Sequence, residues 1–438
     1  MIYVEKPSFC GGKELFNVAQ LEKAILVGLE RPGCQEQYEI SMDELALLAR
    51  TAGAKVAAVI TQKRRAPDPA YYIGEGKVEE LAEEARKHGA DLVIFNEELS
   101  ASQIRNLDGL IHIKITDRTA IILDIFARRA RSRDGKLQVE LAQLQYLLPR
   151  LIGLGSQLSR LGGGIGTRGP GETQLESDRR VIRRRIGELK REIASLRRHR
   201  SLHRQRRQKS GIPLISLVGY TNAGKSTLLN ALTGSELYTE NKLFATLDPS
   251  VRRGTLENGR NVLFADTVGF IHHMPKTLET AFRATLEEIA AADLLLHVVD
   301  LSHPEYGSQI SVVREHLKRI EPDYYLRELL VFNKMDLYQD IQNIPFLEQE
   351  YPGACFLSAQ TGLGLEHMKQ RAARLLEKDF EQIKIHLPYG ESTLLQQIKR
   401  WGSVLKVEYH PEYQMIVARV DRATAARLHP FASPPEQG

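Results

Sequence analysis

The sequence predicts an α/β protein in four parts, centred on a doubly wound sheet. Between residues 210 and 380, short apolar runs typical of buried strands alternate with amphipathic stretches typical of helices. Residues 1–130 repeat this alternation and predict a small α/β domain. Two apolar stripes at 131–209 predict a long helical hairpin, and residues 381–438 have the mixed pattern of a small α+β module.

Composition is that of a globular protein, with 42% apolar and 26% charged residues in a chain of 438. No run approaches the roughly 20 apolar residues of a membrane span, and the N-terminus has no signal-peptide pattern. The three cysteines are scattered, without the spacing of a metal site or a disulfide framework. We therefore expect a cytoplasmic protein with no membrane span, and we expect a monomer.

In the first 130 residues the pattern predicts four strands and three helices. The strands are expected at Lys23–Leu29, Lys55–Thr61, Asp91–Phe95 and Ile111–Ile115, and the helices at Ser41–Ala52, Gly76–Lys87 and Ser100–Leu110. Ser41 and Glu44 have the spacing of a capping box. The glycine-containing turn Tyr72–Lys77 lacks P-loop spacing, and we interpret it as a structural turn, with a second nucleotide or RNA contact as the alternative.

Two stripes of apolar side chains predict an antiparallel pair of long helices. The first consists of Leu137, Leu141, Leu144, Leu148 and Leu151, and the second of Ile182, Ile186, Leu189, Ile193 and Leu196. The segment 153–174 between them contains eight glycines, so it cannot form a core. A segment of this length is more typical of a functional tip than of a simple connection, with a disordered linker as the alternative.

Positive charge is concentrated in the second half of the hairpin. Between Arg179 and Lys209 there are fourteen Lys and Arg against two Glu, a local net charge of +12 against +5 for the whole chain. Such a segment favours contact with phosphates over a merely solvated helix face. The arginines expected to contact RNA are Arg160 and Arg168 in the glycine-rich tip, and Arg179, Arg180 and Arg183 in the second helix.

The segment Gly219–Ser226 has the spacing of a P-loop. It follows the mainly apolar run Ile212–Val218 and opens a helical stretch, which is the context that a P-loop requires. Its glycines let the backbone fold round phosphates, and its N–H groups then face the anion. Lys225 is expected to reach the outer phosphates, and the Ser226 hydroxyl to ligate Mg²⁺.

Two further stretches fall where a γ-phosphate sensor is needed. Asp266 ends a predicted strand and can hold the Mg²⁺ shell from the second sphere, while Gly269 lets a backbone N–H approach the γ-phosphate. Thr246 lies in the loop between the P-loop helix and that strand. A threonine there ligates Mg²⁺ only while the γ-phosphate is present, which makes the loop a switch.

The predicted base site selects guanine. Asp336, in the motif Asn333–Asp336 after the strand Leu329–Phe332, can accept from both N1–H and the 2-amino group of guanine. Adenine offers neither donor, and an unpaired buried carboxylate is costly. Ser358–Gln360, after another strand, would support the base through a backbone N–H. Four motifs in this order on the strand ends predict a GTPase and disfavour an RNA-dependent ATPase.

These motifs together define the predicted site. The residues expected to bind GTP are Gly219, Tyr220, Thr221, Asn222, Ala223, Gly224, Lys225, Ser226, Phe244, Ala245, Thr246, Leu247, Asp248, Asp266, Thr267, Val268, Gly269, Asn333, Lys334, Met335, Asp336, Ser358, Ala359 and Gln360. Lys225, Thr246 and Gly269 are the expected catalytic residues. Phe270 follows Gly269 where many GTPases carry a water-orienting glutamine, so intrinsic hydrolysis should be slow. With that hydrophobic residue present, Asn222 suggests a K⁺ ion beside the phosphates.

The glycine-rich stretch Gly164–Glu176, placed ahead of a P-loop, resembles the signature of the HflX family of ribosome-associated GTPases. Tyr72–Lys77 and Asp124–Ala130 also resemble that family, so the likeness covers the N-terminal domain through the GTPase domain. The resemblance implies that the protein binds the large ribosomal subunit, with the hairpin tip against ribosomal RNA, and that it splits or rescues stalled ribosomes. The alternative is an RNA-binding or assembly scaffold in which GTP is structural or regulatory.

Overall fold

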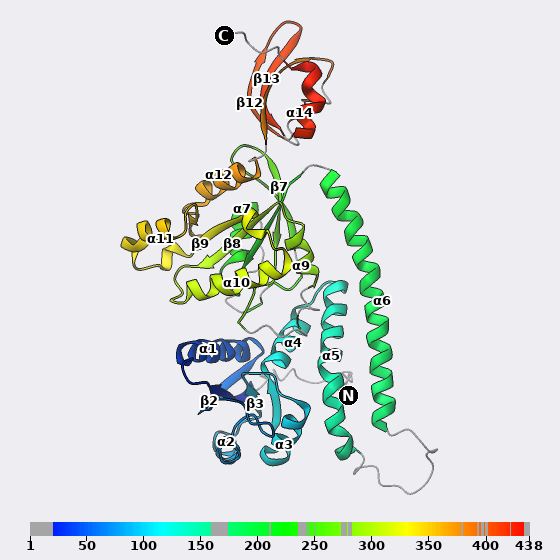
Figure 1. Cartoon of the computed structure of the whole chain (residues 1–438), viewed down its shortest axis with the longest axis vertical. Coiled ribbons are helices and arrows are strands. Elements are labelled where there is room, and N and C mark those ends of the chain that lie inside the picture. Colours follow the sequence, from blue (N-terminus) through cyan, green and yellow to red (C-terminus); the bar gives the residue numbers. More distant parts are fainter. Residues whose placement is uncertain are drawn as a thin grey trace, which may run out of the picture.

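The structure is a computed structural model that describes residues 21–158, 174–209, 212–234, 243–244, 246–248, 250–272, 278, 283–377, 380–391, 394–395, 398, 402–420 and 422–432. Ala245, predicted to bind GTP, and Arg160 and Arg168, predicted to contact RNA, lie outside these residues. Figure 1 shows the N-terminal domain at one end of the long axis, the central domain in the middle and the C-terminal module at the other end, with the hairpin alongside. Within the described ranges, no helix is long and apolar enough to cross a bilayer.

The N-terminal domain is a three-layer α/β/α unit, which confirms the predicted class. Its four parallel strands have the order β2-β1-β3-β4. Helices α1 and α4 pack on one face and α2 and α3 on the other. The elements are β1 (Glu22–Glu30), α1 (Gln35–Thr51), β2 (Ala54–Lys63), α2 (Glu75–His88), β3 (Leu92–Phe95), α3 (Ala101–Ile111), β4 (Lys114–Asp117) and α4 (Arg118–Arg129).

Two local predictions in this domain are wrong. Helix α1 begins at Gln35, six residues before the expected start, so Ser41 lies inside the helix and does not cap it. Ile111 ends α3 and not a strand, and β4 begins only at Lys114. The start at Ser100 is as expected, because this residue forms a capping box with Gln103.

The two leucine and isoleucine stripes form an antiparallel hairpin, as predicted. Helices α5 (Arg133–Leu158) and α6 (Gln174–Lys209) share a buried seam of residues from both stripes. Arg185 of α6 pairs with Glu140 of α5 through hydrogen bonds of 2.8 and 3.1 Å. The second helix is anchored to the central domain by Arg200, which binds Glu287 at 3.1 Å.

The central domain is a doubly wound sheet with one antiparallel edge. The strand order is β10-β9-β8-β5-β7-β6, and only β6 runs antiparallel to its neighbour. Helices α7 and α12 pack on one face, and α9 and α10 on the other. The elements are β5 (Leu214–Gly219), α7 (Lys225–Thr233), β6 (Ser250–Thr255), β7 (Asn261–Asp266), α9 (Arg283–Ala290), β8 (Leu294–Asp300), α10 (Tyr306–Ile320), β9 (Glu328–Asn333), α11 (Ile344–Glu350), β10 (Cys355–Phe356) and α12 (Leu365–Leu376).

The C-terminal module is a small α+β unit. Strands β11 (Glu381–Pro388), β12 (Ser403–Tyr409) and β13 (Tyr413–Val420) form an antiparallel sheet with β13 in the centre. Helix α14 (Arg422–Leu428) closes its apolar face over Ile385, Ile416 and Ala418. The three strands lie where the sequence predicts them.

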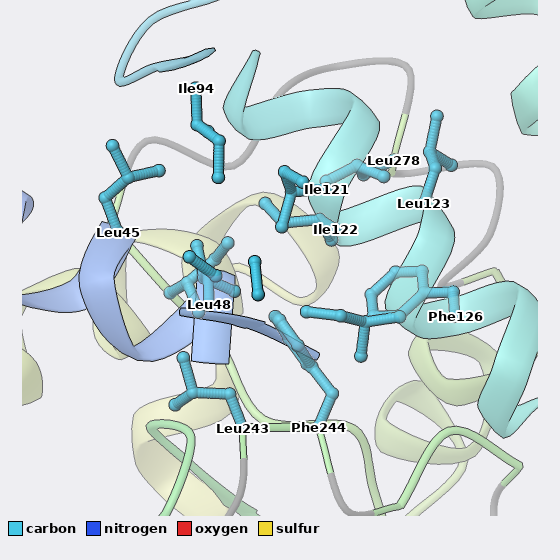
Figure 2. Close-up of a cluster of buried hydrophobic side chains, with 14 of the residues drawn as sticks. Leu45, Leu48, Ile94, Ile121, Ile122, Leu123, Phe126, Leu243, Phe244 and Leu278 are labelled. Carbon is cyan, nitrogen blue, oxygen red and sulfur yellow. The ribbon is translucent and has the colours of Figure 1, made fainter. Parts of the chain in front are cut away.

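One apolar core joins the N-terminal domain, the hairpin and the central domain. Leu45 and Leu48 of α1 and Phe126 of α4 pack there with Phe244 of the central domain, as Figure 2 shows. The same cluster contains three residues of α5 (Val139, Ala142 and Tyr146) and five more of the central domain (Leu243, Leu247, Val268, Ile271 and Leu278). The loops predicted to sense the γ-phosphate are therefore packed against the other two parts.

Candidate functional site

A cavity of about 620 Å³ opens at the carboxyl ends of the central strands. Ligands bind in this position in doubly wound folds, because the loops after parallel strands meet there. It brings together residues from all four sequence motifs. The lining consists of Thr221, Asn222, Gly224, Lys225, Ser226, Thr227, Phe244, Thr246, Thr267, Gly269, Asn333, Lys334, Asp336, Leu337, Ala359 and Gln360.

The P-loop connects β5 to α7, and two of its glycines are required by contacts. A Cβ at Gly219 would overlap the Val298 carbonyl of the neighbouring β8. Gly224 has a φ of +90°, which disfavours other residues, and a Cβ there would overlap the side-chain nitrogen of Asn333. The loop therefore lies directly against the strand ends, with its helix N-terminus directed into the cavity.

Lys225 is held in place by the loop that it follows. Its ammonium group donates to the carbonyls of Gly219 at 3.2 Å and Tyr220 at 2.8 Å. Burial lowers the pKa of Lys225 to about 8, although the carboxylate of Asp266 acts in the opposite direction. Phosphates in the cavity would supply the negative charge that this buried ammonium needs.

Three oxygen-bearing side chains converge beside the lysine. The hydroxyl groups of Ser226 and Thr246 both donate to one carboxylate oxygen of Asp266 at 2.7 Å, and they lie 2.9 Å from each other. The carboxylate of Asp266 is fully buried, and its other oxygen has no hydrogen-bond partner within the part of the chain that the structure describes. Burial raises the pKa of Asp266, against the opposing effect of Lys225. A cluster made only of oxygen donors fits Mg²⁺.

The segment after Asp266 is joined to the P-loop by backbone hydrogen bonds. Thr221 donates its N–H to the Phe270 carbonyl at 2.9 Å, and Phe270 donates to the Gly219 carbonyl at 3.1 Å. A Cβ at Gly269 would lie 2.7 Å from the Cα of Thr221, so only glycine fits there. Phe270 is buried and stacks on His316 with ring centroids 5.2 Å apart. Its side chain therefore points into the core and cannot orient a water molecule.

Asn333 joins the phosphate loop to the base-recognition loops. Its amide donates to the Ala223 carbonyl at 2.9 Å, and its side-chain oxygen accepts from the Ala359 N–H at 2.9 Å. Lys334 has a φ of +63° and pairs with Asp300 at 2.6 Å. Asp336 lines the same cavity.

Several residues predicted to bind GTP direct their side chains elsewhere. Tyr220 places its hydroxyl group 2.7 Å from Glu44 of the N-terminal domain. Leu247 and Val268 are buried in the core shared with that domain. The carboxylate of Asp248 binds the start of α5. Among the described residues, the other predicted ones outside the lining are Gly219 and Asp266, which support the P-loop and the two hydroxyl groups beside it, and Ala223, Met335 and Ser358, which pack around the base-recognition loops.

A buried polar network at the domain interface carries no sequence motif. Arg118, at the start of α4, forms an ion pair with Glu44 and donates to Asn96 at 3.0 Å. Glu44 accepts from the Tyr220 hydroxyl group, which in turn accepts from the His272 N–H at 2.8 Å. The network links the N-terminal domain to the P-loop and to the segment after Gly269. Residues that meet over separations of 74 and 176 positions leave no local signal in the sequence.

The predicted RNA-binding arginines of α6 differ in exposure. Arg180 and Arg183 are exposed, whereas Arg179 is partly buried. Arg185, which was not among the predicted residues, pairs with Glu140 and stabilises the hairpin instead. Two of the three predicted arginines on this helix are therefore exposed to solvent.

Three family models match the chain in succession. They are described as "GTP-binding GTPase N-terminal" at residues 39–127, "GTP-binding GTPase Middle Region" at 129–207 and "50S ribosome-binding GTPase" at 214–334. Among solved structures, the chain is similar to a GTP-binding protein from Sulfolobus solfataricus in complex with GDP. That match has a TM-score of 0.43 and 24% identity, and it covers 82% of this chain and 99% of the other.

Curated relatives match over nearly the whole length. GTPase HflX of Caldanaerobacter subterraneus subsp. tengcongensis is 47% identical, and the match covers 94% of each chain. GTPase HflX of Alkalihalophilus pseudofirmus is 54% identical over 73% of this chain and 76% of the relative. GTPase HflX of Escherichia coli is 44% identical over 88% and 90%. The motifs, the cavity that unites them and these relatives lead to one conclusion: the chain belongs to the HflX family of GTPases.

Proposed function

We propose that this GTPase binds the large ribosomal subunit through its basic hairpin, and that it splits or rescues stalled ribosomes in a cycle controlled by GTP. The third family model that matches the chain describes a 50S ribosome-binding GTPase, which supports this partner. A ribosomal partner also places the protein in the cytoplasm, where we propose that it acts as a monomer. GTP binding favours the bound state, and hydrolysis releases it.

The observation that carries the proposal is that the hairpin and the nucleotide loops share one core. Val139, Ala142 and Tyr146 of α5 are buried in the same cluster as Phe244 and Leu247, which lie two residues before and one residue after Thr246. A change in the Thr246 loop therefore alters the packing of the helix that carries the tip. The exposed arginines of α6 supply the charge that RNA attracts.

The Mg²⁺ site in this proposal uses the hydroxyl groups of Ser226 and Thr246, with Asp266 in the second sphere. The ion would neutralise charge that develops on the phosphates. Lys225 binds the outer phosphates, and the N–H of Gly269 orients the γ-phosphate. Since Phe270 is buried, the attacking water is placed by backbone groups or by the ribosome, and ribosomes should accelerate hydrolysis.

A K⁺ ion beside Asn222 is the further cofactor that we propose. Asn222 lines the cavity with a φ of +63°, beside the loop that would hold the phosphates. Turnover should then be faster in K⁺ than in Na⁺ at equal ionic strength. Equal hydrolysis rates in the two salts would exclude a role for K⁺.

Co-sedimentation with purified large subunits tests the ribosome proposal. Binding should be tighter with a non-hydrolysable GTP analogue than with GDP, and weaker in the double variant Arg180→Glu/Arg183→Glu. The matched control reverses two exposed charges on the N-terminal domain, Arg105→Glu and Lys55→Glu. A variant lacking residues 153–174 tests the tip. Equal binding by the tip deletion would exclude that role.

Sucrose-gradient profiles of 70S-type particles distinguish ribosome splitting by this protein from a scaffold function. Conversion to free subunits in the presence of GTP analogue supports splitting. Binding without conversion, together with hydrolysis that ribosomes do not stimulate, would support the scaffold function instead.

A further inference from the structure

The loop that carries Thr246 is held by the other parts of the protein on both sides of this residue. Phe244 packs edge-on against Phe126 of α4, with ring centroids 4.8 Å apart. Leu247 is only 6% exposed and lies in the core shared by the three parts. Figure 2 shows Phe244 among side chains of α1 and α4. The position of Thr246 therefore depends on residues outside the central domain.

The strongest of these contacts joins Asp248 to the start of α5. One carboxylate oxygen of Asp248 accepts from the backbone N–H groups of Arg131 at 2.8 Å and Ser132 at 2.7 Å. The other accepts from the Ser132 hydroxyl group at 2.5 Å. Three donors meet a negative charge at the positive end of a 26-residue helix, which strengthens each bond. A Cβ on Gly135 would overlap this carboxylate, so the contact also requires a glycine in the first turn of α5.

Only one residue, Leu247, separates Asp248 from Thr246. Leu247 is buried, so the backbone between the two contacts has little freedom to absorb a movement. When Thr246 binds next to Ser226 and Asp266, Asp248 lies against α5. If the Thr246 hydroxyl group leaves, the carboxylate must either strain this short connection or leave the helix.

We propose that Asp248 is a positioning residue for GTP hydrolysis, which holds Thr246 at the Mg²⁺ site by binding Arg131 and Ser132, the two residues immediately before α5. The inference deepens the function proposed above and rests on it for the Mg²⁺ site, because it names the contact through which the nucleotide controls the hairpin. Coupling between two sites is reciprocal. GTP with Mg²⁺ therefore tightens the attachment of α5, and loss of that attachment weakens the binding of GTP more than that of GDP.

Two variants remove the contact in different ways. Asp248→Asn removes the negative charge and keeps the size of the side chain. Gly135→Ala removes no polar group, but its new methyl group displaces the carboxylate, while alanine is the better helix former. The matched control is Gly187→Ala in α6, where an added Cβ meets no atom within 4 Å.

Nucleotide affinity gives the first readout. With Mg²⁺ present, both variants should bind a non-hydrolysable GTP analogue about tenfold more weakly, within the usual range of coupling between sites. Their affinity for GDP should change less than about twofold, because Thr246 ligates Mg²⁺ only while the γ-phosphate is present. An unchanged affinity for GDP also shows that the variants are folded. Wild-type affinity for the analogue in both variants would overturn the proposal.

Hydrogen exchange gives a readout that does not depend on hydrolysis. The amides of Arg131 and Ser132 are the donors of the contact, so their exchange should slow when the GTP analogue binds to the wild type and to Gly187→Ala. The slowing should be lost in Gly135→Ala and Asp248→Asn. If the exchange rates of these two amides in the wild type do not change when the GTP analogue binds, the inference is also overturned. If exchange and affinity respond as expected but large subunits do not bind, the ribosome proposal fails and the role of Asp248 stands.

Discussion

Replacing Tyr220 by phenylalanine tests the buried network that joins the P-loop to the N-terminal domain. The hydroxyl group of Tyr220 donates to the Glu44 carboxylate at 2.7 Å and accepts from the His272 N–H at 2.8 Å. A hydrogen bond to a charged group contributes about 1.5–3 kcal/mol, and one between neutral groups about 0.5–1.5 kcal/mol. Because the side chains of Tyr220 and Glu44 are buried, we expect Tyr220→Phe to reduce the free energy of unfolding by about 2–4 kcal/mol.

Tyr38→Phe is the matched control, because it removes the same atom from another tyrosine. The Tyr38 hydroxyl group makes one neutral hydrogen bond, at 2.7 Å to Thr61, in a partly buried position. Its loss should cost about 0.5–1.5 kcal/mol. Urea unfolding followed by far-ultraviolet circular dichroism measures both values, from the shift in midpoint and the slope.

The reasoning is refuted if Tyr220→Phe is no more destabilising than Tyr38→Phe. A double-mutant cycle with Glu44→Gln adds a second condition. Since the two side chains are in contact, the double variant should cost less than the sum of the single ones, by about 0.5–3 kcal/mol. Additive effects would mean that Glu44 is stabilised by Arg118 alone.

Three further predictions concern the nucleotide site and its supporting strands. Gly269→Ala should abolish hydrolysis while GDP still binds, because the new Cβ would lie 2.7 Å from the Thr221 Cα; single-turnover assays and GDP titration measure the two effects. Asp336→Asn should remove the preference for guanine and weaken GTP binding by about tenfold to a hundredfold, as a competition assay with ATP and ITP will show. Burial lowers the pKa of His297, against the opposing effect of Glu328. The ring of His297 therefore takes up a proton less readily in the folded protein than in the unfolded chain, which does so below about pH 6.5, so stability should fall as the pH drops through that value. Urea midpoints between pH 5 and 7 should fall less steeply in His297→Gln than in the control His367→Gln.

The sequence predicted the parts of the site that depend on local patterns. The P-loop, Asp266, Asn333 and Asp336 each follow a short apolar strand, and strand ends in a doubly wound sheet meet at one edge. That argument needs no knowledge of side-chain contacts. It succeeded because the chemistry of each motif is contained in a few neighbouring residues.

The parts that were missed depend on tertiary contacts. Glu44 has the spacing of a helix cap, but Arg118 and Tyr220, far away in the sequence, bury it inside α1 instead. Strand β6 was not predicted because its sequence is largely polar and exposed, as suits the edge of a sheet. Asp248 was assigned to the nucleotide, since nothing in its neighbours indicates that the start of α5 lies beside it.

Because α5 is long, a small rotation about its first turn produces a large displacement at its other end. Its 26 residues extend about 39 Å at the usual rise per residue, and the far end of the helix includes residues 153–158, the start of the glycine-rich segment. A tilt of about 10° near Asp248 would therefore sweep that end through about 7 Å, more than the helical pitch. A small rotation of α5 moves the oxygen atoms of Ser226, Thr246 and Asp266 by less than an atomic radius. At the distal end of α5, the same rotation becomes a displacement on the scale of a nucleotide.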